Sequence, residues 1–200
     1  MSNYKKIILI FCSIIFITLL CLYLFYDLKF IDEFFYSKII SLKSDMSTDI
    51  FKFFTFLGST LFIIILMILV LIFNKNLGIK LLISVIIVTI VNNLIKILIC
   101  RDRPIDINLI TETGYSFPSG HSITSVSSYG LLLYYLLLSK INKNVKKILI
   151  FILCIIMLMV PISRVYLGVH YFSDVVAGAC LGIDWIILYT WFIEKKKNVK

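Results

Sequence analysis

Six apolar stretches, most of them close to the length of a membrane-spanning helix, dominate this 200-residue chain. A helix needs about 20 apolar residues to cross a hydrocarbon core of about 30 Å. Hydrophobic residues make up 60% of the chain, against roughly 45–50% in soluble domains. We therefore expect an all-α bundle of six transmembrane helices, forming a single domain over residues 1–200. The expected spans cover residues 7–26, 52–73, 81–99, 121–138, 148–162 and 175–193.

The segment between the first two expected spans is amphipathic. Apolar side chains alternate there with charged ones at roughly helical spacing, which is typical of a helix lying in the membrane interface. We therefore predict an interfacial helix within residues 27–50. Its apolar residues are Phe30, Phe34, Phe35, Ile39, Ile40 and Leu42.

The distribution of lysine predicts the orientation in the membrane. Six spans place both termini on one side, and twelve of the twenty basic residues fall on that side, with only Glu194 among the eleven acids. The positive-inside rule then makes both termini cytoplasmic in a multi-pass protein of the cell membrane. This placement also explains the net charge of +9, so we expect no nucleic-acid partner. The twelve residues are Lys5, Lys6, Lys75, Lys80, Lys140, Lys143, Lys146, Lys147, Lys195, Lys196, Lys197 and Lys200.

The opposite, extracytoplasmic face receives the segments 27–51, 101–120 and 163–174. Polar side chains at the edge of an apolar span are functional candidates, because burying them near lipid is unfavourable. The two histidines of the chain, His121 and His170, are both among them. The other candidates are Lys96, Arg103, Ser119, Gly120, Arg164 and Asp174.

Each candidate alone has an ordinary explanation. Lys96 can extend to the interface, Arg103 and Arg164 can anchor it, and Asp174 can cap a helix. Together, however, three cations in a partly dry site repel one another unless an anion fills it. Arginine offers a planar fork to phosphate and lysine adds a point charge. A divalent metal would be poorly served by one carboxylate in such a shell, so we expect a phosphate site without metal or cofactor.

His170 and Asp174 are four residues apart. In a helix both would lie on one face, where a carboxylate holds the imidazole in one tautomer. A histidine oriented in this way is prepared for nucleophilic attack.

Three motifs carry a family resemblance. They are Lys-x6-Arg-Pro at 96–104, Pro-Ser-Gly-His at 118–121 and Ser-Arg-x5-His-x3-Asp at 163–174. In this order the trio resembles the signature of the type-2 phosphatidic acid phosphatase superfamily, which includes lipid phosphate phosphatases and vanadium haloperoxidases. The first 50 residues carry no part of it.

The resemblance implies a role for each residue. His170 would attack phosphorus to give a phosphohistidine, and Asp174 would orient it. His121 would protonate the leaving lipid oxygen and then activate water. The phosphoryl oxygens would be held by Lys96, Arg103, Arg164, Ser119 and the Gly120 N–H group.

The expected substrate is a membrane lipid phosphate at the outer face. Undecaprenyl diphosphate, phosphatidic acid and phosphatidylglycerophosphate are the candidates. Two alternatives remain open: a lipid phosphotransferase on the same fold, and an anion channel or transporter, although a pore has no need of a His–Asp pair. The sequence assigns no role to Asp184 and no oligomeric state.

Overall fold

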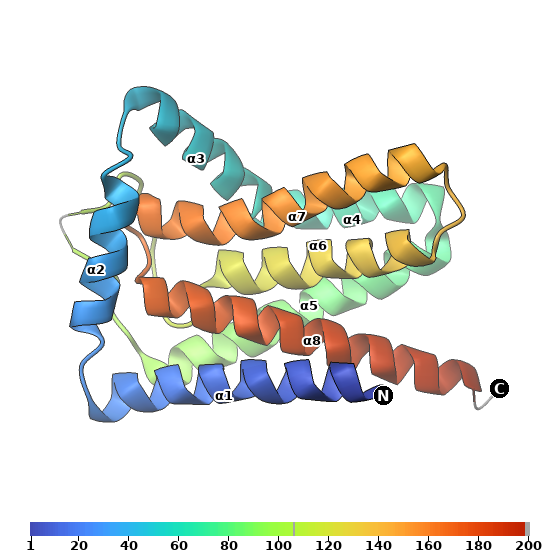
Figure 1. Cartoon of the computed structure of the whole chain (residues 1–200), viewed down its shortest axis with the longest axis horizontal. Helices are drawn as coiled ribbons and strands as arrows, with labels where there is room; N and C mark the ends of the chain where they lie inside the picture. Colours follow the sequence, from blue (N-terminus) through green and yellow to red (C-terminus); the bar gives the residue numbers. More distant parts are fainter. Residues whose placement is uncertain (106, 199–200) are drawn as a thin grey trace.

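The protein is a bundle of helices, seen in a computed structural model that describes residues 1–105 and 107–198 (Figure 1). Every regular element in these residues is helical, which confirms the all-α prediction. The elements are α1 (Asn3–Phe25), α2 (Lys29–Ile40), α3 (Asp45–Leu57), α4 (Thr60–Phe73), α5 (Lys75–Ile99), α6 (Gly120–Leu138), α7 (Lys143–Tyr166) and α8 (Phe172–Asn198).

Within the described residues, four helices are long and apolar enough to cross a membrane: α1, α5, α7 and α8. The pair α3 and α4 passes the same test if it counts as one bent span. The fold is therefore that of a multi-pass membrane protein, while α6, the fourth predicted span, falls outside this set. Its residues 122–131 are all buried and include five serines and threonines. Because α6 packs against α4, α5, α7 and α8, these hydroxyl groups face protein rather than lipid.

The span predicted as one helix over residues 52–73 is wrong in detail. The helix is interrupted at Gly58, and α3 and α4 meet there at an angle of 54°. Ser59 caps the new helix, since its Oγ accepts a hydrogen bond from the Phe62 N–H at 3.2 Å. A Cβ on Gly58 would lie 2.2 Å from Cγ1 of Val160, so only glycine lets α7 approach this closely.

Two other predicted spans are longer in the structure. The helix expected over residues 81–99 starts at Lys75, where Asn74 Oδ1 accepts the Leu77 N–H at 3.1 Å. The helix expected over residues 148–162 is α7, which begins at an asparagine cap and continues to Tyr166. Both capping asparagines lie in segments that hydropathy marks as polar loops, so the helices begin earlier than their apolar stretches.

The remaining boundaries lie closer to the prediction. The first and fourth expected spans, residues 7–26 and 121–138, correspond to α1 and α6. The last, residues 175–193, is extended at both ends in α8. Lys200, counted in the predicted charge distribution, lies outside the described residues.

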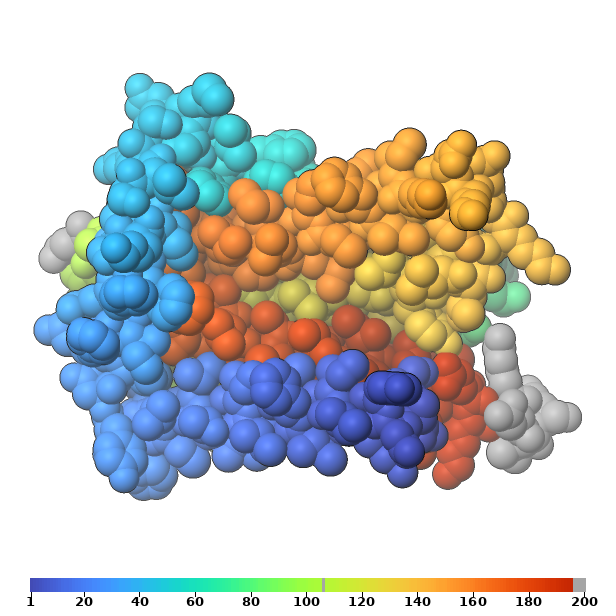
Figure 2. Space-filling view, viewed as in Figure 1, coloured from blue at the N-terminus to red at the C-terminus, as the bar shows by residue number. Residues whose placement is uncertain are grey.

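The predicted interfacial segment contains two helices instead of one. Helix α2 runs across one end of the bundle, where the space-filling view shows it covering the ends of other helices (Figures 1 and 2). Phe35 of α2 stacks on Phe172 at the start of α8, with ring centroids 3.7 Å apart. Helix α3 begins with a capping box between Ser44 and Ser47 and then leads into the break before α4.

The bundle has two distinct ends. The start of α1 and the last part of α8 lie at one end, whereas α2 crosses the other (Figure 1). Four helix ends meet at the end that α2 crosses: the C-terminal ends of α5 and α7 and the N-terminal ends of α6 and α8. All three sequence motifs lie at these helix ends, so the fold gathers them at the end away from the termini.

Candidate active site

A cavity of about 280 Å³ lies at the motif-bearing end of the bundle. Three predicted site residues, Ser119, Arg164 and Asp174, do not line this cavity; all three are fully buried. The five predicted site residues that line it are Lys96, Arg103, Gly120, His121 and His170.

His170 and Asp174 would share a helical face only if the chain were helical through both, and it is not. Helix α7 ends at Tyr166 and α8 starts at Phe172, so His170 lies in the turn between them. Gly168 makes this turn with φ of +68°, and a Cβ there would lie 2.3 Å from the carbonyl oxygen of Ile107. The turn still brings His170 Nδ1 to 3.4 Å from Asp174 Oδ2.

The partners of His170 define its tautomer. Nη1 of Arg103 lies 3.0 Å from Nε2 of His170. A guanidinium can only donate, so Nε2 is the acceptor and the ring proton is on Nδ1, toward Asp174. Burial, with the charges of Arg164 and Arg103, lowers the pKa of His170 well below its usual range. The imidazole is therefore neutral near pH 7, and the electron pair of Nε2 accepts from Arg103.

Arg103 holds two loops together around the cavity. Its Nε and Nη2 donate to the carbonyl oxygens of Gly114 and Thr113 at 2.9 and 3.0 Å. Its Nη1 also donates to the Val169 carbonyl oxygen at 2.8 Å. Burial lowers the pKa of Arg103, but a guanidinium stays charged in a protein. Its charge therefore stays beside His170.

Lys96 approaches the same loop from the end of α5. Its Nζ donates to the carbonyl oxygens of Tyr115 and Ser116, the latter at 3.3 Å. An ammonium group has three donors that can be redistributed, so an oxyanion in the cavity can compete for Lys96. Lys96 and Arg103 thus point into the cavity from two different elements.

Arg164 is paired with an acid that the sequence analysis did not single out. Its Nη2 lies 2.5 Å from Oε1 of Glu112, and its Nη1 donates to Thr55 Oγ1 at 2.6 Å. Nε of Arg164 is buried without a hydrogen-bond partner in the described part of the chain. Glu112 also lies 3.8 Å from Nη2 of Arg103 and lines the cavity. Three clustered cations need a negative counter-charge, and this requirement could have pointed to Glu112 from the sequence.

The start of α6 supplies both backbone donors and the second imidazole. The Ser119 N–H donates to the Asp174 carbonyl oxygen at 3.0 Å, which ties α6 to α8. Ser119 Oγ is buried and finds no partner among the described residues. Gly120 opens the helix, whose first N–H groups have no intrahelical acceptor and can bind an anion. A Cβ on Gly120 would lie 3.2 Å from Nδ2 of Asn92, so glycine permits close packing of α5.

The carboxylate of Asp174 has further partners that sequence reasoning missed. Its Oδ1 accepts a hydrogen bond from Arg101 Nη1 at 2.7 Å, and Arg101 Nη2 binds Asp32 Oδ2 at 2.7 Å. Arg101 lies two residues before Arg103 in the first motif, and Asp32 lies in the amphipathic segment. Neither position is distinguished by spacing alone.

Asp184, which the sequence left without a role, does not line this cavity. Its Oδ2 accepts a hydrogen bond from Ser13 Oγ at 2.9 Å. This contact joins α8 to α1.

The fold and the cavity together define a class. The chain is a multi-pass membrane protein in which two imidazoles and two cationic side chains face one cavity, an arrangement suited to an anionic group. The PAP2 superfamily matches residues 77–198, more than half of the chain, and the chain belongs to this superfamily.

Comparison with individual proteins gives the same family. A crystal structure described as the first transmembrane PAP2-type phosphatidylglycerolphosphate phosphatase from Bacillus subtilis is similar over 94% of this chain and 96% of that chain, with a TM-score of 0.85 and 27% identity. Phosphatidylglycerophosphatase B of Bacillus subtilis is 40% identical over 111 residues, 54% of each protein. Undecaprenyl-diphosphatase of Sulfolobus acidocaldarius is 32% identical over 134 residues, 64% of this chain and 60% of that protein. The chain therefore spans between half and two thirds of these two curated relatives.

Proposed function

We propose that this protein hydrolyses a membrane lipid phosphate or diphosphate through a phosphohistidine formed on His170. The observation that carries the proposal is the environment of His170: its Nε2 accepts from Arg103, and its Nδ1 faces Asp174. This leaves a neutral, oriented nucleophile beside cations. Membership of the PAP2 superfamily and the phosphatase names of the relatives support the same reaction.

In the first step, Nε2 of His170 attacks phosphorus, and the bond between phosphorus and the lipid oxygen breaks. His121, on the same cavity wall, is protonated when the substrate binds; it gives this proton to the departing lipid oxygen and becomes neutral. Asp174 stabilises the positive charge that develops on the His170 ring, through the Nδ1 proton. The phosphoryl oxygens are held by Lys96, Arg103 and the Gly120 N–H group, which line the cavity. Arg164 and Ser119 do not line it, but each keeps a buried donor without a partner among the described residues, Nε and Oγ, that a bound phosphoryl group would engage.

In the second step, neutral His121 removes a proton from water, and the resulting oxygen attacks phosphorus. The bond to Nε2 breaks, which releases inorganic phosphate and restores both imidazoles to their starting forms. Phosphoryl transfer of this kind depends mainly on positioning and on neutralising the equatorial oxygens, which arginine and lysine side chains do.

The donor set favours a reaction that needs no metal. Glu112 is the one carboxylate that lines the cavity within the described residues, and it is already paired with Arg164. Apart from the phenol of Tyr115, the other charged and titratable side chains that line it are cations and imidazoles. We therefore propose that a chelator leaves the rate unchanged.

The cavity wall also indicates how a lipid is accommodated. Four polar residues of α4 and α5 extend the wall into the apolar part of the bundle, so a headgroup can enter between these helices while its chain stays in lipid. Phosphatidylglycerophosphate and undecaprenyl diphosphate are the substrates that the relatives' names suggest, and phosphatidic acid is a third candidate. The four wall residues are Thr60, Thr89, Asn92 and Asn93.

We further propose that the cavity faces the extracytoplasmic side. The start of α1 and the last part of α8 lie at the end of the bundle away from the motifs, and lysines gather in the segments on the side of the termini. In this topology the bent pair α3 and α4 is the second of six spans, α6 is the buried fourth, and α2 lies in the interface.

The decisive test is phosphate release by the purified protein in detergent, on a panel of lipid mono- and diphosphates with and without EDTA. We expect wild-type turnover in both conditions, none with His170→Ala, and wild-type rates with the exposed control Asn144→Ala. Turnover of His170→Ala at the wild-type rate would overturn the mechanism. Transfer of labelled phosphate to another lipid instead of water would indicate the phosphotransferase.

A further inference from the structure

We propose that Asp32 of helix α2 is a positioning residue for the reaction. Through Arg101 and Ser173 it holds the carboxylate of Asp174 in the orientation that His170 requires. For its catalytic consequence, this inference rests on the proposed function. It assigns a role in catalysis to the amphipathic segment 27–50, which carries no part of the three motifs.

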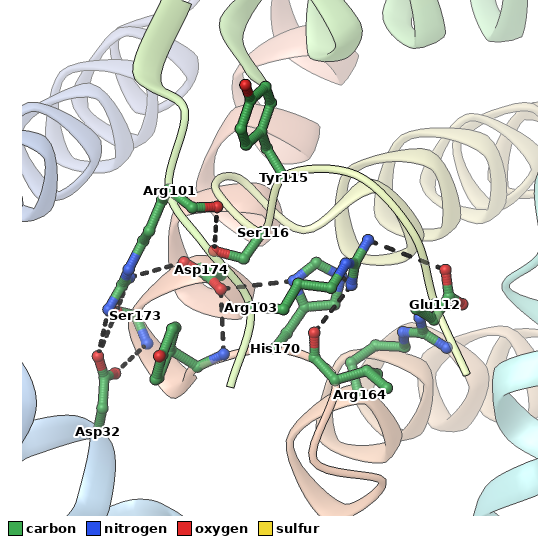
Figure 3. A network of polar contacts seen from close by, with 12 residues as sticks. Asp32, Arg101, Arg103, Glu112, Tyr115, Ser116, Arg164, His170, Ser173 and Asp174 are labelled. Atoms are coloured by element: carbon green, nitrogen blue, oxygen red, sulfur yellow. Dashed lines mark hydrogen bonds and ion pairs between the residues drawn. The ribbon is translucent and has the colours of Figure 1, made fainter. Parts of the chain in front are cut away.

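Arg101 bridges two buried carboxylates. Its Nη1 lies 2.7 Å from Asp174 Oδ1, and its Nη2 lies 2.7 Å from Asp32 Oδ2 (Figure 3). The other oxygen of Asp174, Oδ2, accepts the Tyr171 N–H at 3.0 Å and faces His170. One oxygen of Asp174 is thus held by Arg101 while the other serves the imidazole, so the position of Arg101 sets the angle of the carboxylate.

Asp32 holds both Arg101 and the start of α8. Its Oδ1 accepts the Ser173 N–H at 2.8 Å, and its Oδ2 accepts the Ser173 hydroxyl at 2.9 Å. The Ser173 Oγ in turn accepts from Arg101 Nη1 at 2.7 Å. Asp32 therefore caps the first turn of α8 from a different helix, the turn that carries Asp174.

Burial makes these contacts strong. Asp32 is 3% exposed, Arg101 7% and Asp174 0%, so water is largely excluded from competing for their hydrogen bonds. The rings of Tyr171 and Tyr23 cover the guanidinium, with centroids 4.1 and 4.9 Å from its central carbon. These ring contacts restrain the guanidinium.

The charge balance makes Asp32 more than a structural contact. The single positive charge of Arg101 is shared between Asp32 and Asp174. The pair of carboxylates and Arg101 therefore has a net negative charge, which stabilises the imidazolium of His170. Without the charge of Asp32, Arg101 would be neutralised by Asp174 alone. Asp174 would then be a weaker acceptor for the Nδ1 proton, and the developing charge on His170 would be less stabilised.

The test compares Asp32→Asn with Asp32→Glu and with Glu33→Gln, the neighbouring exposed carboxylate. The full chain is purified in detergent and assayed for kcat, KM and inhibition by inorganic phosphate. Asp32→Asn should lower kcat about 10- to 100-fold, as for loss of a hydrogen bond to a charged group. KM and the inhibition constant should stay within about twofold, because the phosphate contacts are intact. Asp32→Glu should recover most of kcat, and Glu33→Gln should match the wild type.

A wild-type kcat in Asp32→Asn would overturn the inference. So would a fall in kcat accompanied by an equal weakening of phosphate binding, measured as the inhibition constant, because it would indicate general disruption of the site. Arg101→Lys provides a second variant, because lysine keeps the charge but presents no fork to two carboxylates. It too should lower kcat at unchanged KM, and wild-type kcat there would count against the inference. An inactive wild type would overturn the proposed function instead, so the two failures are distinguishable.

Discussion

Arg103 donates from Nη1 to Nε2 of His170 at 3.0 Å, so a cation is bonded to the atom proposed as the nucleophile. Because arginine has no acceptor, this contact leaves the ring proton on Nδ1, which donates it in a hydrogen bond to Asp174 Oδ2. A phosphoryl oxygen that binds Arg103 would replace Nε2 as the acceptor and would place phosphorus next to the freed electron pair. Binding and nucleophile exposure are thereby coupled in one contact.

The orientation of His170 by Asp174 predicts a selective loss of kcat. Asp174→Asn keeps the size of the side chain but removes the charge that stabilises the imidazolium. We expect kcat to fall by roughly 10³- to 10⁴-fold, as when the carboxylate behind another catalytic histidine is neutralised. Steady-state kinetics, with the exposed Asp49→Asn as control, would measure it. A change in KM alone would contradict the proposed role.

The depressed pKa of His170 predicts activity on the acid side of neutrality. A lowered pKa means that the ring loses its proton at lower pH, so neutral His170 persists below its ordinary pKa of about 6.5. The acid limb of kcat/KM should therefore lie below that pH, since it reports the free enzyme. Arg103→Gln removes a nearby cation, so the acid limb should move upward. A limb that stays or moves downward would be inconsistent with this reasoning.

The pairing of Glu112 with Arg164 predicts tighter anion binding when the acid is neutralised. Glu112 places a negative charge on the cavity wall, where it opposes a phosphate dianion. Two charges about 4 Å apart in water interact by about 1 kcal/mol, so Glu112→Gln should strengthen phosphate inhibition about fivefold. Competitive inhibition of the wild type and of Glu112→Gln, with Asp49→Asn alongside, would measure this. Weaker inhibition would indicate that Glu112 acts chiefly by holding Arg164 in place.

The contact between Gly58 and Val160 predicts a rescue. A Cβ on Gly58 would lie 2.2 Å from Val160 Cγ1, so Gly58→Ala should destabilise the protein by about 1–3 kcal/mol through overpacking. The double variant Gly58→Ala with Val160→Ala should recover part of the loss, because the second change removes the methyl group in the way. Thermal unfolding in detergent of both single variants and the double variant would show it. Strict additivity would mean that the two residues do not clash.

Much of the fold and part of the candidate site could be predicted from local sequence. Hydropathy found the apolar helices, because transfer of one helix into lipid depends on its own composition. The three motifs also gather at one end of the bundle, since each lies at a helix end. The break at Gly58 and the asparagine caps had only weak local signals, which the apolar runs and polar loops obscured.

By itself, then, the sequence determined that the chain is a helical membrane protein and which eight candidate site residues to examine. Tertiary packing alone decided that His170 stands in a turn and that serine-rich α6 is the buried centre. It also paired Glu112 with Arg164 and brought Asp32 to Arg101, 69 residues away in sequence. Hydropathy and motif spacing report on neighbours along the chain, whereas these pairings depend on how separate helices pack.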